Sequence, residues 1–187
     1  MEITVSPSSE AEFTLFLRVP GWSGSNKVAV NGWPVEGTVN PGRYFAVRRR
    51  WQGGDRVSVS FDVSPRFTTA NPQLGEDTGK VAVERGPLVY CLEALDQKGV
   101  SSLNGVSLPV RPELAKGFGE ESRRDLLGGV RVLKYEGRIS DGILSNALYA
   151  PLSWKPSRPI ELTFIPYYAF ANRDATHMIV WTPYFQA

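Results

Sequence analysis

Between positions 13 and 19 the chain reads Phe13-Thr14-Leu15-Phe16-Leu17-Arg18-Val19, with an apolar side chain at every second position from Phe13 onward. The same alternation returns at Val57-Ser58-Val59-Ser60-Phe61-Asp62-Val63 and again from Ile160 to Phe164. Successive side chains of a β-strand point to opposite faces of its sheet, so each stretch indicates a strand with one buried face. The β-branched and aromatic side chains in these stretches are also typical of strands.

Glycine and proline residues separate the apolar runs and predict turns between them. The 187 residues include 18 glycines and 14 prolines. A tight hairpin is predicted around Asn31-Gly32, and a second around residues 51–55, which would join strands at 43–50 and 56–63. We therefore predict an all-β fold of antiparallel strands, in the form of two small β-sandwich or jelly-roll-like modules.

One segment is the best candidate for a boundary between these modules. Residues 69–79 have no periodicity and several turn-forming residues. We therefore place the first β-sandwich module at residues 1–76 and the second at 77–187. Helix is scarce, because only residues 112–116 and 120–127 could hold a helical turn.

Composition and charge exclude several classes of function. Lys and Arg number 21, and Asp and Glu 19, so the net charge of +2 gives no basic surface suited to nucleic acid. No stretch approaches the roughly 18 consecutive apolar residues of a membrane-spanning helix. We expect neither nucleic acid nor a membrane among the partners. The start, Met1-Glu2-Ile3-Thr4-Val5, lacks a signal peptide pattern, which slightly favours the cytoplasm and leaves the compartment open.

Candidate catalytic groups are few. One cysteine, Cys91, and one histidine, His177, are too few for a Cys/His zinc site within the chain. Glu84 and Glu93 flank a predicted strand and are the carboxylates to test for glycoside hydrolysis, although a salt bridge on a strand face is the better interpretation of Glu84. Cys91 lies in an apolar run, which is typical of a buried, inert thiol. We therefore assign no catalytic and no metal-binding residue.

The five tryptophans suggest a binding function instead. Flat aromatic rings stack on the C–H faces of sugars, so exposed tryptophans on a β-sandwich are typical of a carbohydrate-binding module. Trp22 and Trp33 lie at or beside predicted turns and are the candidate sugar-stacking residues. Trp51 and Trp181 lie at strand ends, where a core lid or an interface anchor is more common.

Several segments together resemble a known family. The most specific are Arg85-Gly86-Pro87-Leu88-Val89-Tyr90-Cys91-Leu92-Glu93 and Pro166-Tyr167-Tyr168-Ala169-Phe170-Ala171-Asn172-Arg173. With the strand that leads to Pro20-Gly21-Trp22 and the turn at Asn31-Gly32, they occur in the order found in one group of enzymes. Over nearly its whole length the chain resembles the C-terminal region of the bacterial β-L-arabinofuranosidases of glycoside hydrolase family 127.

The resemblance implies that the chemistry lies outside this chain. Members of the family look like an (α/α)6 barrel that carries the active site, followed by β-sandwich domains. Their catalysis resembles that of a zinc-held cysteine nucleophile on the barrel, and Cys91 matches a cysteine of the accessory region instead. The resemblance therefore implies no cofactor in this chain and zinc only for the missing catalytic domain. It also implies that the first module lacks strands that the full protein would supply before Met1.

Two functions remain open. The chain is either a non-catalytic accessory region that braces the catalytic barrel of the same polypeptide, or a free-standing carbohydrate-binding module. In the first case a homodimer partner is a further candidate, and the parent enzyme would act on plant-type arabinose-containing glycans. A binding module should expose two or three roughly coplanar tryptophans, whereas a brace should expose an apolar patch of several hundred Å². In either case we expect the chain alone to be inactive.

We interpret Arg85, Gly86, Pro87, Asn172 and Arg173 as structural or interface residues. Gly86 precedes a proline, so its backbone should be extended or positive in φ, and Pro87 would set the entry into the next strand. The planar guanidinium groups of Arg85 and Arg173 suit bidentate pairing with carboxylates. We therefore predict that Arg85 is partly buried and paired.

Overall fold

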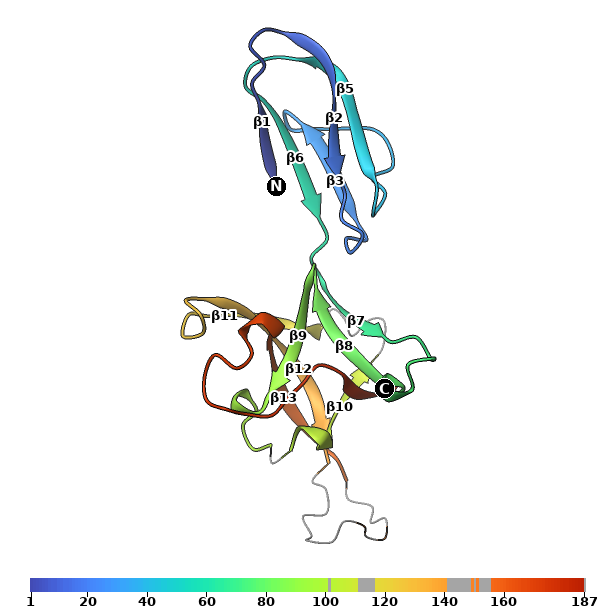
Figure 1. Cartoon of the computed structure of the whole chain (residues 1–187), viewed down its shortest axis with the longest axis vertical. Coiled ribbons are helices and arrows are strands. Elements are labelled where there is room, and N and C mark those ends of the chain that lie inside the picture. Colours follow the sequence, from blue (N-terminus) through green and yellow to red (C-terminus); the bar gives the residue numbers. More distant parts are fainter. Residues whose placement is uncertain (101, 111–116, 141–148, 150, 152–155, 187) are drawn as a thin grey trace. The chain divides into compact units, whose positions relative to one another are not determined.

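The computed structural model describes residues 1–100, 102–110, 117–140, 149, 151 and 156–186. Within this part of the chain, the regular structure consists of β-strands and short 3₁₀-helices, without an α-helix (Figure 1). The prediction of an all-β fold is confirmed. The chain divides into two units, Met1–Val63 and Ser64–Ala187. No helix among the described residues is long and apolar enough to cross a membrane.

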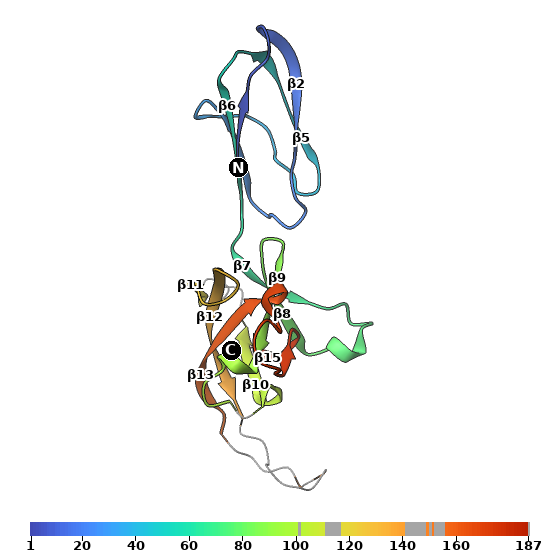
Figure 2. The same cartoon turned by 60° about the vertical axis from the view of Figure 1, so that its left-hand side comes forward.

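The first unit consists of two sheets that enclose one core. Its strands are β1 (Glu2–Val5), β2 (Ala11–Arg18), β3 (Asn26–Val30), β4 (Trp33–Pro34), β5 (Tyr44–Trp51) and β6 (Asp55–Phe61). One antiparallel sheet has the order β1-β6-β3-β4, and β2 pairs with β5 alone. Figure 2 shows β6 and the β2–β5 pair as separate layers. The alternation read from the sequence explains the core, whose buried side chains come from both layers: Leu17, Val28, Val30, Val47, Trp51, Val57 and Val59.

The second unit contains a closed ring of six strands. Its described strands are β7 (Pro65–Thr69), β8 (Lys80–Arg85), β9 (Leu88–Glu93), β10 (Val106–Val110), β11 (Gly119–Arg123), β12 (Val130–Ile139), β13 (Arg158–Pro166), β14 (Met178–Ile179) and β15 (Thr182–Gln186). The ring runs β9-β13-β12-β10-β15-β8 and returns to β9. Its β10–β15 pair is parallel and its other pairs are antiparallel. The strands β7, β11 and β14 pair with β8, β12 and β9 outside the ring.

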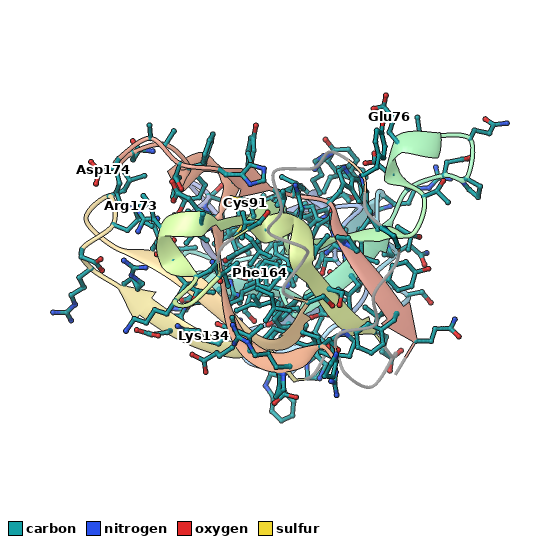
Figure 3. All side chains as sticks on the ribbon, turned by 90° about the horizontal axis from the view of Figure 1, so that it is seen from below. Glu76, Cys91, Lys134, Phe164, Arg173 and Asp174 are labelled. Carbon is teal, nitrogen blue, oxygen red and sulfur yellow. The ribbon has the colours of Figure 1, made fainter. Side chains whose placement is uncertain are left out.

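The core of the second unit fills this ring. Buried apolar side chains from the ring strands form it, Phe164 among them, and Figure 3 shows Phe164 amid the dense side chains at the centre. A second, smaller apolar cluster contains Cys91 and Ile165. These two residues are directly opposite each other on β9 and β13. Because they alternate with Leu92 and Phe164 of the main core, they belong to the other face of the same strands.

Short 3₁₀-helices lie in the connections of this unit. Those in the described part of the chain are η1 (Gly75–Asp77), η2 (Ala94–Asp96), η3 (Leu103–Gly105) and η5 (Tyr167–Ala169). The short helix η2 directly follows β9, and η5 directly follows β13. The two stretches that carried the family resemblance most specifically meet here, because Pro166 pairs with Tyr90 and Arg173 donates to Glu93.

The structure corrects the predicted module boundary. The division falls between Val63 and Ser64, not between residues 76 and 77. The cause is β7, which pairs with β8 over five residues and so belongs to the second unit. The aperiodic segment 69–79 is the connection between these two strands, with η1 inside it.

One further prediction is wrong. The strands β5 and β6 do not form a hairpin, because β5 pairs with β2 while β6 pairs with β1 and β3. The turn between them crosses from one layer to the other. Of the two stretches that could have held a helical turn, 120–127 begins in a strand, at residues 119–123, and 112–116 lies outside the described residues.

The architecture of the second unit differs from the predicted sandwich. Its strands close into a mixed barrel through the parallel pair β10–β15, so they do not form two separate facing sheets. The first unit has two layers on a shared core.

Candidate functional site

The most densely charged buried site lies where β9 ends. We call it the arginine–carboxylate cluster, and it contains Glu93, Asp96, Arg123, Asp125 and Arg173. Arg173 donates through Nη1 to Asp96 Oδ1 at 2.9 Å and through Nη2 to Asp96 Oδ2 at 2.6 Å, and Nη2 also donates to Glu93 Oε2. Arg123 donates through Nη1 to Asp96 Oδ1 at 2.5 Å and through Nη2 to Asp125 Oδ2 at 2.5 Å. Figure 3 shows Arg173 at the margin of the unit, beside Asp174.

The local fold explains how these residues meet. Glu93 is the last residue of β9, and the tight turn of η2 brings Asp96 back beside it. Arg123 ends β11, and Arg173 follows η5, so four separate elements converge. The guanidinium forks supply three donors to Asp96, two to Asp125 and one to Glu93, and Arg173 pairs bidentately as predicted.

Burial sets the energetics of this cluster. The side chain of Glu93 is 0% exposed, and among the described residues its Oε1 has no hydrogen-bond partner, nor has Nε of Arg173. Burial alone would raise the pKa of Asp96, but the hydrogen bonds from Arg173 and Arg123 outweigh it and hold that pKa below its ordinary value. The hydrogen bonds to Asp96 also raise the pKa of Arg173. Asp96 and Arg173 are therefore both charged at neutral pH, and the cluster joins three segments of the chain.

Gln97 adds a neutral connection next to the cluster. Its Nε2 donates to the carbonyl groups of Glu93 at 3.0 Å and Thr163 at 2.8 Å, and its Oε1 accepts from the Thr163 amide at 3.0 Å. The buried Gln97 side chain thus makes the two backbone hydrogen bonds with Thr163 of β13 that a neighbouring strand would otherwise make.

The only cysteine is not arranged as a nucleophile. Cys91 is fully buried in the smaller apolar cluster. Burial, and then the charges of Glu93 and Asp96, raise the pKa of its thiol to about 12. Nucleophilic and metal-binding cysteines need the thiolate form, which is disfavoured here. No group of three His, Cys, Asp or Glu side chains in the described part of the chain could hold a metal ion, so these residues do not fit a zinc site.

The two glutamates considered for glycoside hydrolysis lie apart. Glu84 is opposite Val89, four residues along β9 from Glu93, which corresponds to roughly 13 Å. Glycosidases hold their two carboxyl groups about 5 Å or about 6.5–9.5 Å apart, and the contacts of Glu84 and Glu93 do not draw these two together. Glu84 instead accepts from Arg66 at 2.5 Å, and Glu93 from Arg173. Both carboxylates are therefore occupied by arginines.

The segment Arg85-Gly86-Pro87 forms the turn of the β8–β9 hairpin. Arg85 pairs with Leu88 across a two-residue loop, and Gly86 has φ +56°. A positive φ followed by a proline is the pattern of a type II′ hairpin turn, and confirms the conformation predicted for Gly86. Arg85 is partly buried and donates through Nε and Nη2 to Glu120 at 3.0 and 3.1 Å, as its predicted pairing requires.

The change Gly86→Ala is expected to lower the free energy of unfolding by about 1 kcal/mol or more, because an alanine strains a backbone with positive φ. Gly53→Ala is the matched control, since Gly53 also lies in a turn, has no positive φ and has open space around its Cβ position. Urea unfolding of the two variants measures the difference. Equal stabilities would contradict the assigned turn.

The side-chain hydrogen bond of Asn172 is made outside the arginine–carboxylate cluster. It is exposed, and its Nδ2 donates to the carbonyl of Phe170 at 3.0 Å. That bond shapes the loop after η5, from which the neighbouring Arg173 reaches the cluster.

Among the described residues, Trp22 and Trp33 do not form the coplanar platform that a binding module would show. Trp22 packs edge-on against Phe61, and Phe61 pairs with Asn26, the first residue of β3. Trp33 pairs with Val30, the last residue of β3. The two candidates therefore belong to opposite ends of β3, roughly 13 Å apart along the strand. Trp33 is 79% exposed, whereas Trp51 is fully buried. Trp181 is partly buried, and Trp154 lies outside the described residues.

Sequence reasoning missed Asp96, Gln97, Arg123 and Glu120. Each of them makes a side-chain hydrogen bond with a residue that is 27 to 77 positions away in the chain. A carboxylate soon after Glu93 was visible, but no local pattern linked it to Arg173.

Comparison with known families separates the chain at the same point as the structure. Residues 1–63 match the family model of the β-L-arabinofuranosidase GH127 middle domain. Residues 65–183 match the glycoside hydrolase family 127 C-terminal domain. The chain belongs to glycoside hydrolase family 127.

Known relatives of this GH127 chain are longer. It is 34% identical over 193 residues to the non-reducing end β-L-arabinofuranosidase of Bifidobacterium longum subsp. longum, a match that covers 97% of the chain and 28% of that enzyme. A crystal structure of a GH127 β-L-arabinofuranosidase from Geobacillus stearothermophilus T6 is 35% identical, with a TM-score of 0.85 over 98% of the chain and 28% of the enzyme. A further solved glycoside hydrolase is 30% identical, with a TM-score of 0.86 over 98% of the chain and 30% of that protein. The chain thus spans less than a third of these relatives.

Proposed function

We propose that the chain is a non-catalytic accessory region of a glycoside hydrolase that resembles the β-L-arabinofuranosidases. One observation carries this proposal: within the described residues, the carboxylates considered for catalysis are paired with arginines, and the cysteine is buried with a thiol pKa of about 12. The chain also covers 28% of a β-L-arabinofuranosidase, in the region of the middle and C-terminal domains.

In this role the two units brace a catalytic barrel of the same polypeptide. The barrel would supply the zinc-held nucleophile and the sugar pocket, and the parent enzyme would act on arabinose-containing glycans. Support comes from surface aromatic residues that the chain itself leaves open, Phe16 and Tyr44 on the first unit and Tyr167 and Tyr168 on the second. A homodimer contact is a further role that such surfaces could serve.

The second candidate function, a carbohydrate-binding module, is favoured by one observation. Trp33 presents a largely exposed indole to solvent. A single ring gives a much weaker platform than a coplanar pair, and Trp22 is partly covered by Phe61. We therefore rank this function second, and loss of glycan binding in Trp33→Ala would be its signature.

The purified chain is expected to release no L-arabinose from an aryl β-L-arabinofuranoside, because the Cys91 thiol is buried with a raised pKa and the described part of the chain brings Glu84 and Glu93 to separate arginines. The Bifidobacterium longum relative serves as the positive control under the same conditions. Release of L-arabinose at a rate abolished by Cys91→Ala would overturn the proposed function. Affinity electrophoresis on arabinan, with Trp33→Ala beside the wild type, tests the second candidate.

A further inference from the structure

One face of the first unit is built like a protein interface. We call it the β2–β5 outer face. The inward side chains of the two strands, Leu17, Val47 and Trp51 among them, belong to the core. The outward side chains on β2 and β5 form four directly opposed pairs, which are Glu12–Arg50, Thr14–Arg48, Phe16–Ala46 and Arg18–Tyr44.

One half of this face is aromatic and open. Phe16 is 63% exposed and Tyr44 is 66% exposed. Phe16 is opposite Ala46, whose small side chain leaves the phenylalanine ring largely uncovered. Two neighbouring aromatic rings held by regular backbone are an unfavourable arrangement in water, and they are typical of surfaces that pack against another protein.

The other half of the face is charged and mainly basic. Arg48 pairs with Glu12 at 3.0 Å and Arg50 with Glu10 at 3.4 Å, and Arg18, directly opposite Tyr44, adds a third arginine at the aromatic end. Three arginines against two glutamates give the face a net positive charge. Arginine and aromatic residues are the types enriched at the centres of protein interfaces, so the composition fits a protein partner with acidic side chains.

The size of the face indicates which partner it suits. Two strands of eight residues present about 260 Å² of sheet surface, at about 3.4 Å per residue and about 4.8 Å per strand. Stable contacts between separate proteins bury about 800 Å² on each partner. A second copy of the chain or a free protein would therefore be held poorly by this face. A domain tethered in the same polypeptide needs far less contact, because its effective concentration is high.

We propose that the β2–β5 outer face docks the part of the polypeptide that precedes the middle domain in this family. Residues 1–63 match a middle domain, so in the family another part comes before it. This inference rests on the proposed accessory function and adds the surface, its aromatic residues Phe16 and Tyr44, and an acidic complementary surface on the docked domain.

Thiol labelling at position 16 tests the proposal. The variant Phe16→Cys has one reactive thiol, because Cys91 is buried with a raised pKa. It is labelled with iodoacetamide in two contexts: the chain alone, and a chimera that joins the chain to the preceding part of the Geobacillus stearothermophilus T6 enzyme. Mass spectrometry of the peptide that contains position 16 gives the rate. Ser58→Cys is the matched control, because Ser58 is exposed on the other sheet, next to the buried Val57 and Val59.

The expected result for Phe16→Cys is fast labelling at position 16 in the chain alone and at least tenfold slower labelling in the chimera. Labelling at position 58 in Ser58→Cys should proceed at the same rate in both contexts. Equal rates at position 16, or protection at position 58 instead, would overturn the proposal. Slow labelling at position 16 in the chain alone would also overturn it, and gel filtration would then show whether a second copy covers the face.

Two further measurements show whether a negative result comes from a misfolded chimera, from a wrong proposed function or from a wrong docking face. Activity of the chimera establishes that it has folded, and a second chimera that grafts residues 1–63 alone serves if the first does not fold. Activity of the isolated chain would remove the accessory function. Unchanged labelling in an active chimera would remove only this inference.

Discussion

Replacement of Arg173 by alanine is expected to lower the free energy of unfolding by about 3–5 kcal/mol. Glu93 is fully buried and accepts its hydrogen bond from Arg173, so the variant leaves a carboxylate in the interior without its cation. Asp96 loses two further hydrogen bonds from the same guanidinium. Removing one partner of a buried pair costs more than the pair contributes, because the remaining charge stays desolvated. Urea unfolding followed by circular dichroism measures the loss.

Two neighbouring variants separate this effect from general damage to the loop. Arg123→Ala removes a donor to Asp96 but leaves Arg173 in place, so we expect a smaller loss of about 1–2 kcal/mol. Asn172→Ala, at an exposed position beside Arg173, should change stability by less than about 0.5 kcal/mol. If Arg173→Ala unfolded at the same urea concentration as Asn172→Ala, the cluster would not stabilise the unit.

The acid side of the stability curve gives an independent check on the same cluster. The pKa of Asp96 is lowered in the folded chain, so its contribution is present above its unfolded pKa of about 3.9 and is lost as the pH falls through the lowered value. The difference between wild type and Arg173→Ala should therefore be largest near neutral pH. It should shrink as the pH falls below about 4 and towards the lowered pKa, because the unfolded chain then binds a proton at Asp96 before the folded wild type does.

Local sequence patterns were sufficient for the strands with the clearest alternation and for one hairpin. Asn31 and Gly32 both have positive φ, at 53° and 85°, which is the type I′ geometry of the tight hairpin predicted there. The turn at residues 52–55 carries equally strong turn residues but joins strands of different layers. Asp55 explains the difference, because it accepts from the Gln52 amide at 2.9 Å and from Asn31 Nδ2 at 2.7 Å. Turn residues predict where the chain reverses, and the partners of each strand depend on such distant contacts.

Closure of the barrel could not be read from the sequence for a related reason. The parallel pair that completes the ring joins Leu108 to Tyr184 and Val110 to Gln186. Alternation of apolar residues is the same in a flat sheet and in a closed one, so it does not distinguish a sandwich from a barrel. The module boundary failed similarly, since β7 looks like any strand beside a loop until its pairing with β8 is known.

The sequence predicted that arginines of the charged site pair with carboxylates, but it did not predict which carboxylates. Guanidinium chemistry was enough to expect Arg85 and Arg173 in carboxylate pairs, and the structure supplies Glu120 for one and Glu93 with Asp96 for the other. The partner of Arg85 is 35 positions away and the nearest partner of Arg173 is 77 positions away. A single sequence carries no signal at such separations.

Trp51→Ala is expected to remove most of the stability of the first unit, about 3–5 kcal/mol. The indole is fully buried between the two layers, stacks on Phe13 with 5.8 Å between ring centroids, and donates through Nε1 to the Phe13 carbonyl at 3.0 Å. The Arg49 guanidinium lies 5.3 Å from its ring centroid. The variant leaves a cavity in the shared core and removes the side-chain bond between the end of β5 and β2. A unit that ends at Val63 has a total stability of only about 3–9 kcal/mol, so this loss brings it close to unfolding.

Amide hydrogen exchange in β2, β3, β5 and β6 is the measurement, because it reports on the first unit separately from the barrel. Trp33→Ala is the matched control: it makes the same chemical change at a side chain that is 79% exposed, and exchange should stay as slow as in the wild type. Trp51→Phe keeps an aromatic ring and loses the N–H donor, so its effect should be intermediate, with about 1 kcal/mol attributable to the lost hydrogen bond. Exchange in Trp51→Ala as slow as in Trp33→Ala would show that other contacts hold the two layers together. Faster exchange confined to β2 and β5 would mean that the indole stabilises its own layer without joining it to the other.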